Sequence, residues 1–209
     1  MKKTLMLNKG LFISTMIVGI VAAGFQLLSN IIDLVYVLDN SSNVSWGTIL
    51  VYILAFAACI TLIVLTSIIF AKADKKKDES GRNLCVSYSI YAIIVGSFNI
   101  IKDVLVLFIG GISVAYFIAL LIEIAVLVLG ILSINFLDKK GNTSKILLLI
   151  IAFAYAIIGT INLFAKLNII GYFYRMVLIA YSVLTIISLF MMKEKEEILE
   201  EPISFIESK

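Results

Sequence analysis

The chain has 209 residues, of which 62% are apolar and 15% are charged, with a net charge of +3, no histidine and one proline, Pro202. Ordinary soluble domains are about 25% charged, and they need more turns and polar faces than this sequence offers. Composition therefore excludes an ordinary soluble domain. The missing histidine also excludes histidine proton shuttles, histidine metal ligands and Ser-His hydrolases.

Six apolar runs are long enough to cross a bilayer, whose hydrocarbon core of about 30 Å takes about 20 helical residues. In chain order they predict spans at residues 11–38, 49–70, 84–108, 113–137, 146–166 and 172–192. We therefore predict an all-α integral membrane protein. Residues 1–192 would form a single six-helix transmembrane domain, and residues 193–209 an acidic cytoplasmic tail.

The start of the first run could be mistaken for a signal peptide. Lys2 and Lys3 precede it, and Val21-Ala22-Ala23 resembles a cleavage site. The apolar region of a signal peptide is about 7–15 residues long, whereas this run continues to Leu38. We favour an uncleaved first span, which is long enough to tilt in the bilayer.

The basic residues predict the orientation. Of the 17 lysine and arginine residues, all except Lys102, Lys166 and Arg175 lie on one side of the predicted bundle, the side with both chain termini. Because positive residues are enriched on the cytoplasmic side of membrane proteins, we predict that the N- and C-termini are both cytoplasmic. The lysines at span ends thus reflect membrane topology, and we expect no binding of nucleic acid.

An internal repeat is visible in the sequence. Residues 52–76 and 116–140 align without gaps, share a tyrosine at Tyr52 and Tyr116, and both end on Asp-Lys-Lys. Shared apolar residues mean little in a membrane protein, but a tyrosine and a charged end at one offset are informative. We predict three helical hairpins, at about 11–72, 84–138 and 146–192, related by a pseudo-threefold axis normal to the membrane.

The first, third and fifth spans share a second pattern, in which two small residues and a bulky one precede a side-chain amide. The amides, each followed by the polar residue four positions later, are Gln26 with Asn30, Asn99 with Asp103, and Asn162 with Lys166. Positions i and i+4 lie on one helix face, small residues allow close helix contact, and a buried amide needs a partner. We predict that the three faces meet near the axis, either as structural contacts, which are common, or as a ligand site between repeats.

Six charged residues fall in the outer half of the predicted bundle: Asp33, Lys102, Asp103, Glu123, Lys166 and Arg175. Glu123 is the deepest, about 15 Å from the outer end of its span at helical rise. It is either ionised beside Lys102 or Arg175, or protonated, and the charges form either a functional site or a structural ion-pair network. The candidate polar cluster comprises Gln26, Asn30, Asp33, Asn99, Lys102, Asp103, Glu123, Asn162, Lys166 and Arg175.

No zincin, nucleophile-elbow or phosphate-loop motif occurs, so we expect no enzyme activity, catalytic residue, cofactor or metal. The first function hypothesis is a non-enzymatic multi-pass subunit or accessory protein of the cell membrane, acting through helix–helix or cytoplasmic-face contacts. The second is a small solute transporter, or the solute-binding subunit of one, using the polar cluster. The expected partners are the lipid bilayer and another membrane protein or transporter subunit; the second hypothesis adds a small-molecule ligand.

Overall fold

The computed structural model describes residues 2–40, 44–73, 79–110, 114–139, 141–164 and 169–197. Six helices and two short strands lie within these residues. They are β1 (Lys2–Met6), α1 (Lys9–Asn40), α2 (Trp46–Ala73), α3 (Ser80–Gly110), α4 (Val114–Leu137), α5 (Gly141–Asn162), α6 (Ile169–Met191) and β2 (Lys193–Glu197). Each helix coincides with one predicted span and is long and apolar enough to cross a membrane. The prediction of a helical, multi-pass membrane protein is therefore confirmed.

Polar side chains cap the N-terminal ends of two helices. The Asn8 side-chain oxygen accepts a hydrogen bond from the backbone N–H of Gly10 at 2.8 Å, at the start of α1. Ser45 Oγ accepts one from the backbone N–H of Thr48 at 3.2 Å, at the start of α2. Such caps satisfy N–H groups of the first turn that have no partner within the helix. The first helix is continuous through the Val21-Ala22-Ala23 segment.

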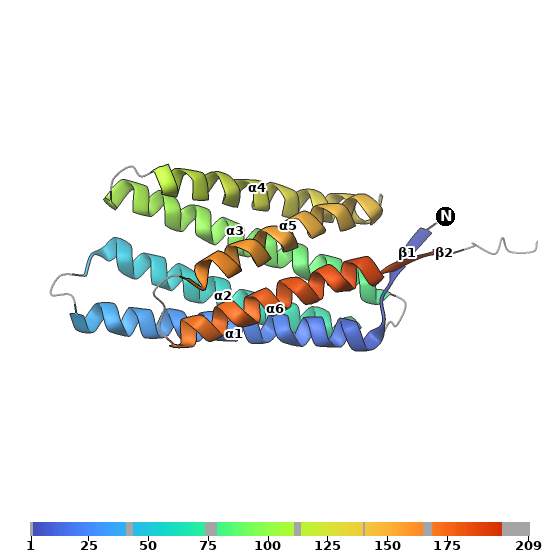
Figure 1. Ribbon diagram of the computed structural model, residues 1–209, viewed down its shortest axis with the longest axis horizontal. Helices are drawn as coiled ribbons and strands as arrows, with labels where there is room; N and C mark the ends of the chain where they lie inside the picture. Colours follow the sequence, from blue (N-terminus) through green and yellow to red (C-terminus); the bar gives the residue numbers. More distant parts are fainter. Residues whose placement is uncertain are drawn as a thin grey trace, which may run out of the picture.

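Consecutive helices pack side by side and α6 returns to α1, so the six helices form a closed ring (Figure 1). Helix α3 also contacts α1 and α5 across the middle, which makes it the most central helix. Helix α6 also contributes to the core, since its residues Tyr181, Ser182 and Leu189 are buried. They are buried because α6 packs between α1 and α5 and closes the ring.

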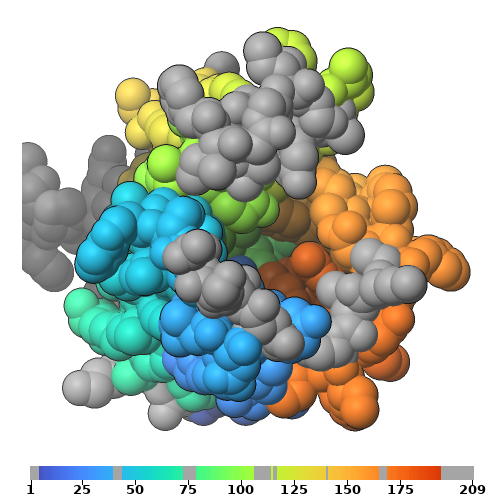
Figure 2. Space-filling model, turned by 90° about the vertical axis from the view of Figure 1, so that its left-hand side faces the viewer, coloured from blue at the N-terminus to red at the C-terminus, as the bar shows by residue number. Residues whose placement is uncertain are grey.

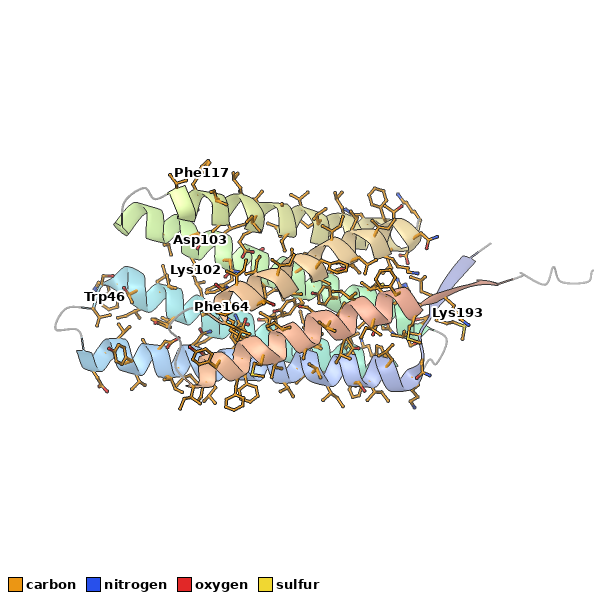
Figure 3. All side chains as sticks on the ribbon, in the orientation of Figure 1. Trp46, Lys102, Asp103, Phe117, Phe164 and Lys193 are labelled. Carbon is orange, nitrogen blue, oxygen red and sulfur yellow. The ribbon has the colours of Figure 1, made fainter. Side chains whose placement is uncertain are left out.

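The outer surface of the helices is apolar. Large exposed side chains such as Ile53, Leu121 and Ile157 occur around the bundle, a pattern that soluble monomers avoid. The aromatic residues Trp46 and Phe117 are exposed far from Lys193, which lies at the other end (Figure 3). Aromatic residues near one end and basic residues at the other match the two polar interfaces of a bilayer.

Residues 2–6 and 193–197 pair in a short antiparallel sheet, which was not predicted from the sequence. Strand β2, from the segment expected to be a tail, pairs with β1 so that Lys2 lies opposite Glu197 and Lys3 opposite Glu196. Ser80 fixes the sheet to α3, since its Oγ accepts a hydrogen bond from Leu7 N at 3.1 Å and donates one to Leu7 O at 2.9 Å.

Candidate functional site

Buried tyrosines fill the middle of the bundle. We call Tyr88 and Tyr91 of α3, Tyr155 of α5 and Tyr181 of α6 the tyrosine layer. Tyr181 meets Tyr88 and Tyr91 edge to face with 5.3 Å between ring centroids in both cases, and Tyr91 meets Tyr155 at 5.7 Å. Edge-to-face contacts are a preferred aromatic geometry. Packed rings, rather than a polar passage, therefore occupy the middle of the described bundle.

This layer was not predicted from the sequence, although a signal was present. Tyrosine is normally enriched at the two membrane interfaces, yet Tyr181 lies ten residues from the end of α6 at Met191, about 15 Å along the helix. Tyr88 and Tyr91 are one turn apart on α3, so their side chains share a face. Tyrosines far from span ends, at helical spacing, could have indicated a buried cluster.

Polar side chains lie on the outer side of the tyrosine layer. Glu123 Oε1 on α4 accepts a hydrogen bond from Asn99 Nδ2 on α3 at 2.9 Å. Gly96 allows α3 and α4 to approach closely here. A Cβ added to Gly96 would lie 3.4 Å from the Glu123 carbonyl oxygen. Asn99, one of the three amides of the repeated pattern, therefore contacts the deepest of the charged residues.

The two cationic residues predicted to pair with Glu123 contact other side chains. Lys102 Nζ lies 3.5 Å from Asp103 Oδ1, and the Asp103 side chain is only 5% exposed. Lys102 acts on Glu123 through longer-range electrostatics, and the described residues show no direct ion pair between Glu123 and Lys102 or Arg175. Arg175 instead lies over the ring of Tyr174, with Cζ 5.1 Å from its centroid, a cation–π contact. Both Lys102 and Asp103 lie in the outer part of the bundle (Figure 3).

Two other members of the predicted cluster contact α2 in the described residues. Asn30 Nδ2 donates to Cys59 Sγ on α2 at 3.7 Å, and Asp33 interacts electrostatically with Tyr52 on α2. Asn162 is half-buried at the last residue of α5, and Lys166 lies outside the described residues. Of the three repeated amides, Asn99 alone has a described hydrogen bond to another member of the cluster.

The small residues of the pattern also have a different role from the one expected. A Cβ added to Gly159 would meet Ile179 of α6 at 3.0 Å, and one added to Gly24 would meet nothing within 4 Å. Gly96 likewise faces α4. These glycines therefore allow close packing of consecutive helices at Gly96 and Gly159, and not of the odd helices with one another.

Four buried polar atoms, each on a different helix, have no hydrogen-bond partner among the described residues. They are Gln26 Oε1 on α1, Glu123 Oε2 on α4, Tyr155 Oη on α5 and Arg175 Nε on α6. We call these side chains, together with Asn99, Lys102 and Asp103, the outer polar layer. Buried polar atoms are nearly always paired, and leaving one unpaired costs about 1–3 kcal/mol. A second group of such atoms, on Ser87, Tyr88 and Ser144, lies in the inner half.

The end of the molecule beyond the outer polar layer is hollowed. Helices α5 and α6 have 22 and 23 residues, whereas α1 and α3 have 32 and 31. The longer helices consequently project past the shorter pair at this end (Figure 1). Figure 2 shows the hollow between the helices, with atoms of α3 and α6 visible at its bottom.

Comparisons with protein-family models, with curated proteins and with solved structures find no match for this chain. The described residues combine buried polar atoms without partners on four helices, a layer of packed tyrosines and a hollow at the outer end of the bundle.

The contact between Asn99 and Glu123 predicts an energetic coupling. Replacing Asn99 by leucine and Glu123 by methionine, singly and together, should give a coupling free energy of about 0.6–1.7 kcal/mol, the range of side-chain hydrogen bonds inside membrane proteins. Unfolding of the purified protein in mixed detergent micelles measures it. The matched control replaces Asn30 by leucine, since Asn30 binds Cys59 instead. Coupling of Glu123 to Asn30 but not to Asn99 would contradict the observed contact.

Proposed function

We propose that this chain is a non-enzymatic membrane subunit that binds a small polar solute in its outer polar layer, as a solute transporter or its solute-binding subunit. The observation that supports this proposal is the set of unpaired buried atoms on α1, α4, α5 and α6. The hollow at the outer end of the bundle (Figure 2) is a second supporting feature. A solute that supplies their missing hydrogen bonds offsets the cost of burying them. Binding sites generally combine a concave surface with a few convergent polar groups of this kind.

The tyrosine layer limits how such a solute could move. The packed rings of Tyr88, Tyr91 and Tyr181 lie between the outer polar layer and the inner end of the bundle. A solute bound above them would reach the inner side only if these rings separated. The proposal is therefore binding followed by a conformational change in the protein or a partner, and not conduction through an open channel.

Isolation of the intact protein in mild detergent, followed by mass spectrometry of bound small molecules and proteins, tests the proposal. We expect a small polar molecule that copurifies with the wild type and raises its melting temperature. It should be lost from the variants Glu123→Gln and Arg175→Gln, because both supply unpaired polar atoms. The variant Arg82→Gln is the control, since Arg82 pairs with Asp138 at the inner end. A wild-type protein that binds no small molecule would refute the proposal.

An accessory role remains the second candidate, and the packed tyrosine layer favours it. A filled middle is what a protein needs if it acts only through its lipid-facing helices or its inner end. The paired strands β1 and β2 give that inner end a fixed surface. In the same isolation experiment, this candidate predicts that a partner protein copurifies with both the wild type and the Glu123→Gln variant. It also predicts that no small molecule is bound.

The proposal includes an orientation in the cell membrane with both termini cytoplasmic. The lysine distribution supports it, and so does the position of β1 and β2 together at one end. Reporter fusions after Asn43 and after Lys77 should report opposite sides, with Lys77 cytoplasmic; the same side for both would refute it. The three-hairpin repeat belongs to this proposal, supported by the packing of α1 on α2, α3 on α4 and α5 on α6.

A further inference from the structure

Two segments of the chain cover the inner end of the bundle, whereas the outer end is hollowed. Strands β1 and β2 both lie at this inner end (Figure 1). Leu5 of β1, Leu7 just after it, and Met192 at the junction of α6 and β2 are all buried. They belong to the same apolar cluster as Leu84 of α3. We call residues 2–7 together with Met192 the inner closure.

The first turn of α3 holds the β1 side of the inner closure. Ser80 Oγ hydrogen bonds to both backbone groups of Leu7, at 3.1 Å to the nitrogen and 2.9 Å to the carbonyl oxygen. One residue later, a Cβ added to Gly81 would lie 2.6 Å from the Leu5 carbonyl oxygen. Glycine at this position therefore lets the backbone of β1 lie directly on α3, where a hydroxyl satisfies the buried polar groups of Leu7.

Met192 connects the same point of α3 to α5. A Cβ added to Gly81 would lie 3.0 Å from Met192 Cγ, and Cys85 Sγ, one turn further along α3, donates to Met192 Sδ at 3.9 Å. From α5, Lys145 Nζ donates to the Met192 carbonyl oxygen at 3.1 Å. Both sides of the inner closure thus meet at Gly81, and Met192 contacts the fully buried Cys85 thiol.

The inner closure is attached to the helices at a few points, and its two segments are joined through a sheet. Beyond Met192, β2 packs mainly on β1, through an antiparallel ladder. Attachment to the helices rests on the hydrogen bonds from Ser80 and Lys145 and on the burial of the apolar side chains. Segments with few buried contacts open at a lower free energy than the whole fold. The ladder couples the two segments, because either one could leave alone only by breaking it.

We propose that the inner closure opens as a unit while the helices stay folded, and that its opening uncovers the Cys85 end of α3. It is thus a conformational device at the end of the molecule opposite the hollow. In the proposed solute-binding protein it acts as a barrier on the inner side, a role that rests on that function. The opening itself needs no solute, because it depends only on contacts between β1, Met192 and the helices.

The native thiol of Cys85 reports the opening in the full-length protein in detergent. N-ethylmaleimide can reach this buried thiol only through an opening of the closure or of the whole bundle. If the closure opens locally, the protection of Cys85 against the reagent is at least about tenfold weaker than the equilibrium constant of global unfolding implies. Equilibrium unfolding in the same mixed micelles supplies that constant, and protection equal to it would overturn the proposal.

A pair of neighbouring variants tests whether Ser80 holds the closure. Ser80→Ala removes both hydrogen bonds to Leu7 and should raise the rate of Cys85 modification about tenfold. The rate at Cys59, buried between α1 and α2, should stay unchanged. Arg82→Gln is the matched control, since Arg82 pairs with an exposed carboxylate after α4, and it should change neither rate. An unchanged Cys85 rate in Ser80→Ala, or an equal rise at both thiols, would overturn the proposal.

The variant Lys145→Met tests whether the two segments open together. It removes the hydrogen bond to the Met192 carbonyl oxygen while keeping a long side chain. If the closure is one unit, backbone amide hydrogen exchange should become faster in β1 as well as in β2, because the ladder couples the strands. Unchanged exchange in β1 would show that the segments are released separately and would overturn the unit. These measurements use no ligand, so their failure leaves the proposed function standing, and a failure to isolate a solute leaves the closure standing.

Discussion

Replacing Gly81 with alanine is expected to lower the free energy of unfolding by about 2–3 kcal/mol, the upper part of the range for overpacked sites. The new Cβ would lie 2.6 Å from the Leu5 carbonyl oxygen and 2.8 Å from its carbonyl carbon. These are backbone atoms, so no side-chain rotation can relieve the clash. Strand β1 would have to move away from α3, with loss of both hydrogen bonds between Leu7 and Ser80.

Denaturant unfolding of the purified variant measures this effect, and proteolysis near the N-terminus should become faster. The neighbouring substitution Arg82→Gln is the matched control. It removes the ion pair with Asp138. The side chains of Arg82 and Asp138 are 43% and 71% exposed, and such exposed pairs contribute about 0–1 kcal/mol to stability. Equal stability of Gly81→Ala and the wild type would mean that β1 does not pack on α3 as described.

Replacing Gly19 with alanine is expected to lower the free energy of unfolding by about 1–3 kcal/mol, again through overpacking. Its Cβ would lie 2.7 Å and 2.8 Å from two ring carbons of Tyr181, Cε2 and Cζ. That ring cannot shift freely, because Tyr88 and Tyr91 pack against its other sides with 5.3 Å between centroids. The tyrosine layer would be displaced, and solute binding above it should weaken as well.

Gly24 in the same helix provides the control, since a Cβ there meets nothing within 4 Å. Gly24→Ala should leave the free energy of unfolding unchanged or raise it by up to about 1 kcal/mol, because alanine favours the helical state. Thermal unfolding of the two variants and the wild type in one detergent gives the comparison. Equal effects at Gly19 and Gly24 would show that contact with Tyr181 does not control packing in the middle of the bundle.

The sequence by itself determined the six helices and their approximate limits. This information is local, because a run of about 20 apolar residues must form a helix in hydrocarbon to satisfy its backbone hydrogen bonds. The charged ends of the runs then give an expected orientation without reference to packing. The polar residues of the outer half could also be recognised, because intramembrane amides and charges are rare. Their presence in the sequence did not give their partners.

Tertiary structure decided which side chains meet, because contacts depend on the rotation, tilt and neighbours of each helix rather than on its own sequence. Asn99 reaches Glu123, whereas Asn30, equally polar, faces Cys59. The tyrosine layer and the pairing of β1 with β2 join residues far apart in the chain, and no local periodicity encodes such pairings. Local apolarity thus fixes the helices, while long-range packing and hydrogen bonding fix the candidate site.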